Sequence, residues 1–293
     1  TAVYGYEDGA LNTFKKAKEL GLKCIYDLPI AYWETGRKLM LEEAERLPAW
    51  AYTLGGGIKD SEEKLERKTK ELELADIVVG PGEFVKQSLP LWANSKQMIM
   101  APFGSPQRIK NDKRRLNFGK DNSKLRVLFA GSLSQRKGLG DLFSAIRLLN
   151  NPQIELVVMG SLMAPMEFYR KQLPGFTYMP NRSHEQVLAL MRSCDVLCLP
   201  SIVEGRALVM QEAMSQGLPL IITHNTGGED LIEEGCTGFL VPIRSCDAIA
   251  EKLNWFLENR SSISSMGRRA QNHAAKYTWE GYGSKIVSAL LDF

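Results

Sequence analysis

Short apolar runs alternate with amphipathic segments along most of the chain. Continuous apolar runs predict buried strands, whereas apolar residues at three- to four-residue spacing predict helices. We therefore expect strands at residues 2–6, 23–27, 77–79, 98–100, 125–130, 154–159, 176–179, 195–199, 218–223 and 238–241. Helices are expected at residues 11–20, 31–47, 60–74, 83–89, 139–149, 183–193, 207–216, 246–257, 263–277 and 279–291. Strands that alternate with helices are typical of α/β proteins with parallel, doubly wound sheets, and this is the fold class that the pattern predicts.

A cluster of proline and glycine at residues 101–106 divides this pattern in two. Such clusters are typical of connections between domains, and 293 residues are near the practical limit of a single core. We expect a Rossmann-like domain at residues 1–104, a second one at 105–276 and a last helical segment at 277–293. The first domain opens on a strand and has only three or four strands, so we expect it to be the partial, back portion of such a domain. Basic and polar residues fill positions 108–124.

The composition is that of a soluble globular protein, with 44% hydrophobic and 24% charged residues. No apolar run approaches the roughly 18 residues that a membrane-spanning helix needs. The formal net charge of +3 is mild. It permits contact with an anionic substrate or a peripheral contact with a membrane, and we expect no nucleic-acid partner. The five cysteines form no CxxC pair, which favours reduced thiols and a cytoplasmic location.

Glu204 and Glu212 belong to a predicted strand–loop–helix segment. Glu204 lies in the loop after the strand at 195–199, and Glu212 lies one to two turns into the helix at 207–216. In open α/β sheets, ligands bind outside the carboxyl ends of strands, and the free N–H groups at a helix start suit a phosphate. Carboxylates at such a place can accept hydrogen bonds from the hydroxyls of a ribose or a sugar. Two ordinary exposed acids are the plain alternative, because most glutamates are exposed.

The loop at residues 131–138 has glycine at both ends and carries Arg136 and Lys137 beside the next helix. Glycine lets a backbone approach a ligand closely, and the two cations would neutralise a diphosphate. A glycine-capped turn with solvent-exposed charges is equally consistent with this loop. Asp27 ends a strand of the first domain and would face the interdomain cleft if the two sheets oppose their carboxyl edges. An acid at a helix start before Pro29 is the alternative for Asp27.

Motifs of several other classes are absent from the sequence. Neither a GxGxxG loop nor a Walker loop occurs, which counts against a dehydrogenase and a P-loop NTPase. No DxD motif occurs, so the sequence gives no support to a diphosphate site bridged by a divalent metal. The three histidines form no zinc-type cluster with cysteine. We expect neither a metal nor another cofactor.

Taken together, the ordered segments of the second domain resemble a retaining glycosyltransferase of GT-B fold from the GT4 group, the glycosyl transferases group 1. The resemblance is carried by the loop at 131–138, V-V-M-G at 157–160, D-V-L-C-L-P-S-I-V-E at 195–204, E-A-M-S-Q-G-L-P at 212–219 and G-F-L-V-P at 238–242. It implies two Rossmann-like domains that face a cleft, with an N-terminally incomplete acceptor-side domain first. It also implies a final helix that crosses back onto that first domain.

The resemblance implies a role for each matching residue. Glu212 would accept hydrogen bonds from the ribose of the donor, Arg136 and Lys137 would bind its diphosphate, and the loop at 180–182 would lie near its base. Glu204 and Asp27 are the candidate catalytic residues, Asp27 because it lies nearest to the place of a first-domain histidine that is frequent in the family. The other residues expected to bind the donor are Gly131, Ser132, Gly160, Gly205, Arg206, Ala207 and Leu208.

Two positions depart from the family pattern. Ser132 stands where an arginine is frequent, and Gly205-Arg206-Ala207 stands where G-F-G is common. Arg136 could replace the first arginine. The cationic Arg206 is expected to serve an acidic group on the donor or the acceptor.

These features predict a metal-independent, retaining, hexosyl-type glycosyltransferase that moves a sugar from a nucleotide sugar. The expected partners are that donor, as a substrate rather than a cofactor, and an acceptor that is a saccharide, a lipid-linked compound or a small molecule. Two alternatives stay open: a donor-binding chain without turnover, and a nucleotide-sugar epimerase of GT-B shape.

Overall fold

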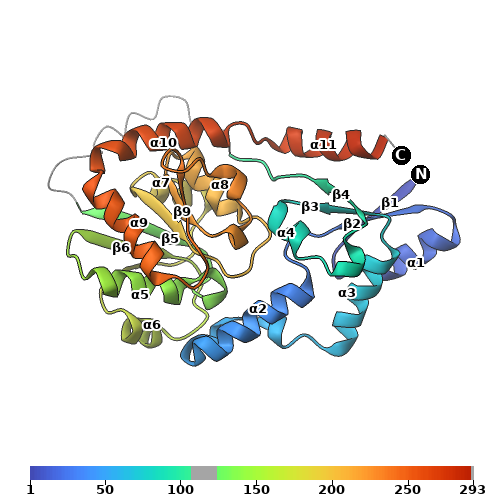
Figure 1. Ribbon diagram of the computed structural model, residues 1–293, viewed down its shortest axis with the longest axis horizontal. Coiled ribbons are helices and arrows are strands. Elements are labelled where there is room, and N and C mark those ends of the chain that lie inside the picture. Colours follow the sequence, from blue (N-terminus) through green and yellow to red (C-terminus); the bar gives the residue numbers. More distant parts are fainter. Residues whose placement is uncertain (107–123, 292–293) are drawn as a thin grey trace.

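Two α/β units lie side by side in the computed structural model, which describes residues 1–106 and 124–291 (Figure 1). The basic segment expected at 108–124 lies outside the described residues, apart from Lys124. In the first unit, a four-stranded parallel sheet has the strand order β1-β2-β3-β4. Its strands are β1 (Ala2–Tyr6), β2 (Lys23–Asp27), β3 (Ile77–Gly80) and β4 (Gln97–Met100).

The second unit has a six-stranded parallel sheet within residues 124–291, in the order β10-β9-β8-β5-β6-β7. Its strands are β5 (Leu125–Ala130), β6 (Ile154–Met159), β7 (Thr177–Met179), β8 (Val196–Leu199), β9 (Leu220–Ile222) and β10 (Gly238–Leu240). The chain runs outward from β5 through β6 to β7 and then returns to place β8 on the other side of β5. This reversal leaves a crevice outside the carboxyl ends of β5 and β8, where ligands bind in folds of this kind.

Helices cover both sheets (Figure 1). Those of the first unit are α1 (Leu11–Glu19), α2 (Trp33–Arg46), α3 (Glu62–Leu74) and α4 (Glu83–Gln87), with 3₁₀ turns η1 (Pro48–Thr53), η2 (Gly56–Ile58) and η3 (Leu91–Ala93). Those of the second are α5 (Leu139–Leu149), α6 (Met166–Gln172), α7 (His184–Met191), α8 (Leu208–Ser215), α9 (Cys246–Glu258), α10 (Arg260–Ala274) and α11 (Trp279–Leu291), with η5 (Gln135–Lys137), η6 (His224–Thr226) and η7 (Glu229–Leu231). The alternation of strands and helices predicted from the sequence is confirmed, whereas α6 was not predicted.

The central strands are buried on both faces, as their continuous apolar sequences require. In β8 every residue is buried, and in β5 only Arg126 is partly exposed. Helix α11 leaves the second unit and lies along the first sheet, as the upper right of Figure 1 shows. There Ile286 packs in one cluster with Ile25, Ile77 and Ile99. This helix therefore ties the end of the chain to the first unit.

Helix α2 makes a second bridge between the units. It leaves the first unit and extends beneath the second (Figure 1), where η1 follows it. Trp50 of η1 is 4% exposed and belongs to the core of the second unit. Its ring makes edge contacts with Phe143, Phe168 and Tyr169 at centroid distances of 4.9–5.9 Å. The two units therefore share part of one core, although the predicted boundary at residue 104 stays a prediction.

Candidate functional site

The loop after β5 and the loop after β8 meet at the crevice between these strands. Arg136 of η5 donates from Nη1 to Oε1 of Glu204 at 2.7 Å and to the carbonyl oxygen of Val203 at 3.0 Å. Lys137 Nζ pairs with the same Glu204 oxygen. Glu204 is only 7% exposed. The structure therefore brings together three predicted site residues from two loops that are 68 positions apart in the chain.

The charges of this trio do not balance. Burial lowers the pKa of Lys137, the neighbouring Arg136 lowers it further, and Glu204 opposes the shift. Two cations share one carboxylate, so the crevice keeps an excess of positive charge in a partly desolvated place. An anion such as a diphosphate would relieve that excess, and it would also free Glu204 to accept hydrogen bonds from hydroxyls.

Gly131 and Gly160 lie in contact at the edge of the same crevice. A Cβ added to Gly160, whose φ is +143°, would overlap the carbonyl oxygen of Gly131. Gly160 is therefore required by a close approach of two backbone segments. The carbonyl oxygen of Gly160 accepts a hydrogen bond from the hydroxyl of Tyr178 at 3.0 Å. Gly160 therefore lies beside the end of β7 and the loop at 180–182. Ser132 Oγ lies 3.3 Å from Ser134 Oγ.

Glu212 lies on α8, and its Oε1 lies 3.5 Å from Nδ1 of His184 at the start of α7. Burial raises the pKa of the Glu212 carboxyl, and His184 opposes the shift. The histidine contact was not expected, because nothing in the sequence relates two residues 28 positions apart on separate helices. The strand–loop–helix context predicted for Glu204 and Glu212 is present, and the ribose role of Glu212 stays a prediction.

Arg206 is bonded within the protein, and the role expected for it toward an acidic group of the donor or the acceptor stays a prediction. Its side chain is fully buried and pairs with Asp230 at 2.7 and 3.1 Å. Its Nε donates to Gln211 at 2.8 Å, and its Nη1 donates to the carbonyl oxygen of Gly227 at 3.2 Å. The guanidinium also lies 5.0 Å from the centroid of the Tyr277 ring. Every nitrogen of the guanidinium is thus committed to the protein.

The residues beside Arg206 are packed or capped. A Cβ added to Gly205 would overlap the carbonyl oxygen of Pro29, so this glycine lets the two units touch. The amide of Ala207 donates to the carbonyl oxygen of Thr226 at 3.3 Å. Leu208 begins α8 and is 42% exposed. Contact of these residues with the transferred sugar stays a prediction.

Asp27 is not brought to the crevice. Its Oδ2 accepts a hydrogen bond from the hydroxyl of Tyr4 at 2.8 Å, and burial raises the pKa of its carboxyl. Asp27 shares a face of β2 with Ile25, which packs against α11. Its strand ends near the second unit, but its side chain lies on the α11 side of the sheet. The catalytic role expected for Asp27 stays a prediction.

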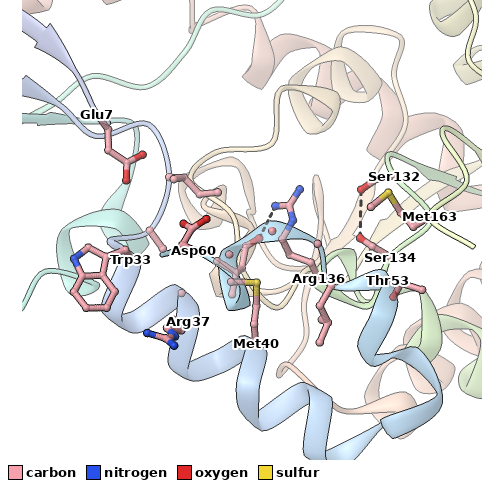
Figure 2. A pocket seen from close by; sticks show the side chains of 18 of the residues that line it. Glu7, Trp33, Arg37, Met40, Thr53, Asp60, Ser132, Ser134, Arg136 and Met163 are labelled. Carbon is pink, nitrogen blue, oxygen red and sulfur yellow. Dashed lines mark hydrogen bonds between the residues drawn. The ribbon is translucent and has the colours of Figure 1, made fainter. Parts of the chain in front are cut away.

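A cavity of about 400 Å³ lies between the two units, next to the crevice. Figure 2 shows Glu7, Asp60, Arg37 and Trp33 on the side of the first unit, with Arg136, Ser132 and Ser134 on the other. Sequence reasoning missed Glu7 as a residue of this cavity. The signal that the sequence does offer is an acid that directly follows a strand, at the same sheet edge as Asp27.

A buried ionic network was also missed. Glu43 of α2 is 0% exposed and accepts hydrogen bonds from Arg46 at 2.7 and 3.1 Å and from Gln135 at 2.8 Å. Arg244 pairs with it as well. Arg46 also donates to both oxygens of Asp141, at 2.8 and 2.9 Å. Since Gln135 directly precedes Arg136, this network holds the cationic loop against α2.

Within residues 1–106 and 124–291, no three histidine, cysteine, aspartate or glutamate side chains gather as a metal site would require. Metal independence stays a prediction. In the same described ranges, no helix has the length and apolar character to cross a membrane.

Comparison with known proteins agrees with this geometry. The sequence model described as "Glycosyl transferases group 1" matches residues 110–273, more than half of the chain. A D-inositol 3-phosphate glycosyltransferase from Arthrobacter sp. (strain FB24) is 30% identical over 177 residues, covering 57% of this chain and 42% of the relative. The sulfoquinovosyl transferase SQD2 of Arabidopsis thaliana is 27% identical over 212 residues, 71% of this chain and 41% of the relative. The chain thus spans less than half the length of these relatives.

Solved structures show the same fold. A sucrose-phosphate synthase from Thermosynechococcus elongatus superposes with a TM-score of 0.73 at 19% identity, covering 99% of this chain and 73% of that one. HepE of Anabaena in complex with UDP gives a TM-score of 0.72 at 18% identity, covering 99% and 79%. These are GT-B glycosyltransferases, so the predicted GT-B fold is confirmed. With the sequence model matched over more than half of its residues, the chain belongs to the glycosyl transferases group 1.

Proposed function

We propose that this protein transfers a hexosyl group from a nucleotide sugar to an acceptor, with retention of configuration and without a metal. The observation that carries the proposal is the trio of Arg136, Lys137 and Glu204 at the point where the second sheet reverses its strand order. Two cations on one buried carboxylate supply the charge that a bridging metal would otherwise provide to a diphosphate leaving group.

The donor would be held from two sides of the crevice. Its diphosphate would lie against Arg136 and Lys137, while hydroxyls of the ribose and the sugar would donate to Glu212 and Glu204. In the front-face route that the resemblance implies, the departing diphosphate oxygen itself accepts the proton of the acceptor hydroxyl. Arg136 and Lys137 would then stabilise the charge that develops on that oxygen.

A uridine diphosphate donor is the first to test. HepE of Anabaena, which shares the fold, has been solved with UDP, with UDP and glucose, and with UDP-glucose. Those ligands are properties of HepE, and we extend them to this chain as part of the proposal. We place the protein in the cytoplasm, where nucleotide sugars and reduced thiols would both be expected.

Thermal melts with UDP-, GDP- and ADP-sugars test donor binding, because a ligand at 100 times its Kd stabilises the folded state by about 2.7 kcal/mol. A donor that raises the melting temperature is then incubated with and without acceptors. Sugar transfer would support the proposal. Binding without transfer would favour a donor-binding protein, and conversion of the sugar without any acceptor would favour an epimerase. Absence of a shift with every nucleotide sugar would contradict all three.

A further inference from the structure

Helix α2 contacts both loops of the crevice, although it begins in the first unit (Figure 1). Met40 packs in one buried cluster with Ile202 and Val203, which lie in the loop after β8. About one turn along the same helix, Glu43 accepts a hydrogen bond at 2.8 Å from Gln135, which lies in the loop after β5. A helix of the first unit therefore supports both walls of the crevice.

Gln135 is 0% exposed, and its side chain is fully bonded. Its Nε2 donates to Oε2 of Glu43 at 2.8 Å and to Oδ2 of Asp141 at 2.7 Å. Its Oε1 accepts the backbone amide of Gly140 at 2.9 Å. An amide group has two N–H donors, and both of them are used here. These bonds hold the side chain of Gln135 in one orientation.

The backbone of Arg136, the next residue, is held between two fixed segments. On one side, the amide of Gln135 donates to Oγ1 of Thr53 in η1 at 3.1 Å. On the other side, the carbonyl oxygen of Arg136 accepts the amide of Ile202 at 2.9 Å. A displacement of Gln135 would therefore move the Arg136 side chain away from Glu204.

Arg244, in the loop after β10, reaches the same network in a strained conformation. Its φ is +63°, in the left-handed region that favours glycine. Its Nε donates to Glu43, and its Nη2 donates to Glu42 at 2.9 Å and to the carbonyl oxygen of Leu39 at 3.3 Å. A strained residue persists only where its surroundings hold it, and here all three partners belong to α2. The side chain of Arg244 therefore joins the second unit to this helix.

The charge of Glu43 keeps the network in order. Burial alone would raise the pKa of its carboxyl, but hydrogen bonds from Arg46, Gln135 and Arg244 lower that pKa below its ordinary value. Glu43 is therefore ionised at neutral pH, and an ionised carboxylate only accepts hydrogen bonds. The NH₂ group of Gln135 must then point toward it, because a reversed amide would place an oxygen against a buried negative charge.

We propose that Glu43 and Arg244 are positioning residues for the diphosphate of the donor: they hold Gln135 in place and thereby set the positions of Arg136 and Lys137. The inference rests on the proposed function, because it takes these two cations as the diphosphate site. Glu43 and Arg244 act through Gln135 and not by contact with the donor. Affinity for a diphosphate bound to the second unit thus depends on a helix of the first.

Two variants test the positioning role by different routes. Glu43→Gln keeps the shape of the side chain but puts a hydrogen-bond donor beside the donors of Arg46 and Gln135. Arg244→Gly removes the side chain at a φ that glycine adopts without strain, so this variant should fold even where the first one does not. Glu45→Gln, which changes an exposed acid of α2, is the matched control.

Binding of UDP, GDP and ADP, each compared with its own nucleoside, is measured by NMR titration, and amide hydrogen exchange is followed at residues 131–138 without ligand. Glu43→Gln should weaken binding of the preferred diphosphate about tenfold and leave binding of its nucleoside within about twofold. Arg244→Gly should change the diphosphate affinity in the same direction. Both variants should accelerate exchange at residues 131–138, and the control should alter none of these properties.

Equal losses of diphosphate and nucleoside affinity would indicate a merely structural role and overturn the inference, as would unchanged diphosphate affinity in both variants. Failure of the unaltered protein to bind any of the three diphosphates would instead defeat the proposed function. The exchange rates distinguish the two failures. Unchanged exchange at residues 131–138 in both variants would overturn the positioning role whether or not a nucleotide binds.

Discussion

At the scale of single residues, Glu212 shows a conflict between stability and function that can be measured. Burial raises the pKa of its carboxyl, so the folded state binds a proton more tightly than the unfolded state does. Stability from this group is gained as pH falls through the raised pKa, and near pH 7 the buried charge costs stability. We therefore expect Glu212→Gln to raise the melting temperature at pH 7.

The same substitution should weaken nucleotide binding by about 1–3 kcal/mol, because a charged acceptor for ribose hydroxyls is lost. In the unaltered protein we expect UDP affinity to fall as the pH falls through the raised pKa of Glu212. Glu212→Gln should abolish this pH dependence. Calorimetric titration with UDP between pH 4.5 and 8, combined with melts in its absence, measures both effects. Glu185→Gln, an exposed acid on α7, should alter neither. Undiminished UDP affinity in Glu212→Gln would remove the ribose assignment.

Arg206 illustrates the opposite case, a cation in a functional segment that serves the fold. Its partners are Asp230, Gln211 and the carbonyl oxygen of Gly227, and Gln211 in turn donates to the carbonyl oxygen of Phe103 at 2.6 Å. Arg206→Ala should lower the free energy of unfolding by about 2–3 kcal/mol, because buried acceptors lose their donor. UDP affinity should change less than twofold.

Urea unfolding and UDP titration of Arg206→Ala separate these two effects. Arg268→Ala on α10 provides the control, since Arg268 is exposed and donates to Ser264 Oγ one turn away, at 2.9 Å. A large loss of UDP affinity with unchanged stability would restore Arg206 to the donor site.

At the scale of elements, the spacing of apolar residues predicted most strands and helices. A strand that is buried on both faces is apolar along its length, and a helix that is buried on one side has apolar residues every three to four positions. Because Arg136, Lys137 and Glu204 follow predicted parallel strands, the sequence could also place them at one edge of the sheet. It could not predict that α2 and η1 cross to the second unit. Trp50 would be buried equally well in the core of either unit. The charged residues of α2 predict a solvent-exposed face, although Glu43 is fully buried. Partners that lie about 90 to 200 positions away leave no local pattern.

The bridge formed by α2 and η1 predicts a coupled effect on stability and on the cationic loop. Trp50→Ala removes a ring packed against Phe143, Phe168 and Tyr169 and should cost about 3–5 kcal/mol. It should also loosen η1, where Thr53 Oγ1 accepts the amide of Gln135 at 3.1 Å. We therefore expect faster hydrogen exchange at residues 131–138. Trp92→Ala, in which a 47% exposed ring is removed, should leave both properties unchanged.

At the scale of the whole molecule, backbone groups of the two units are in direct contact beside the crevice. Gly205 lies against Pro29, and a Cβ added to Gly227 would in turn overlap the carbonyl oxygen of Gly205. The amide of Ala31 also donates to the carbonyl oxygen of Glu204 at 3.3 Å. Glu204 therefore contacts the first unit through its backbone and the cations of the second unit through its side chain, so the spacing of the units sets the width of the crevice.

A single methyl group at this junction tests that dependence. Gly205→Ala places a Cβ on the Pro29 carbonyl, which is a backbone group in the loop after β2 and cannot move aside as a flexible side chain would. We expect the units to separate, with a larger radius of gyration in small-angle X-ray scattering. Sugar transfer should fall by more than tenfold while UDP affinity falls less, because the diphosphate contacts that we propose, Arg136 and Lys137, both belong to the second unit. Gly175→Ala, where an added Cβ meets no atom within 4 Å, should behave as the unaltered protein. An unchanged radius of gyration with full transfer activity would show that the junction tolerates the methyl group and that the spacing of the units does not limit the reaction.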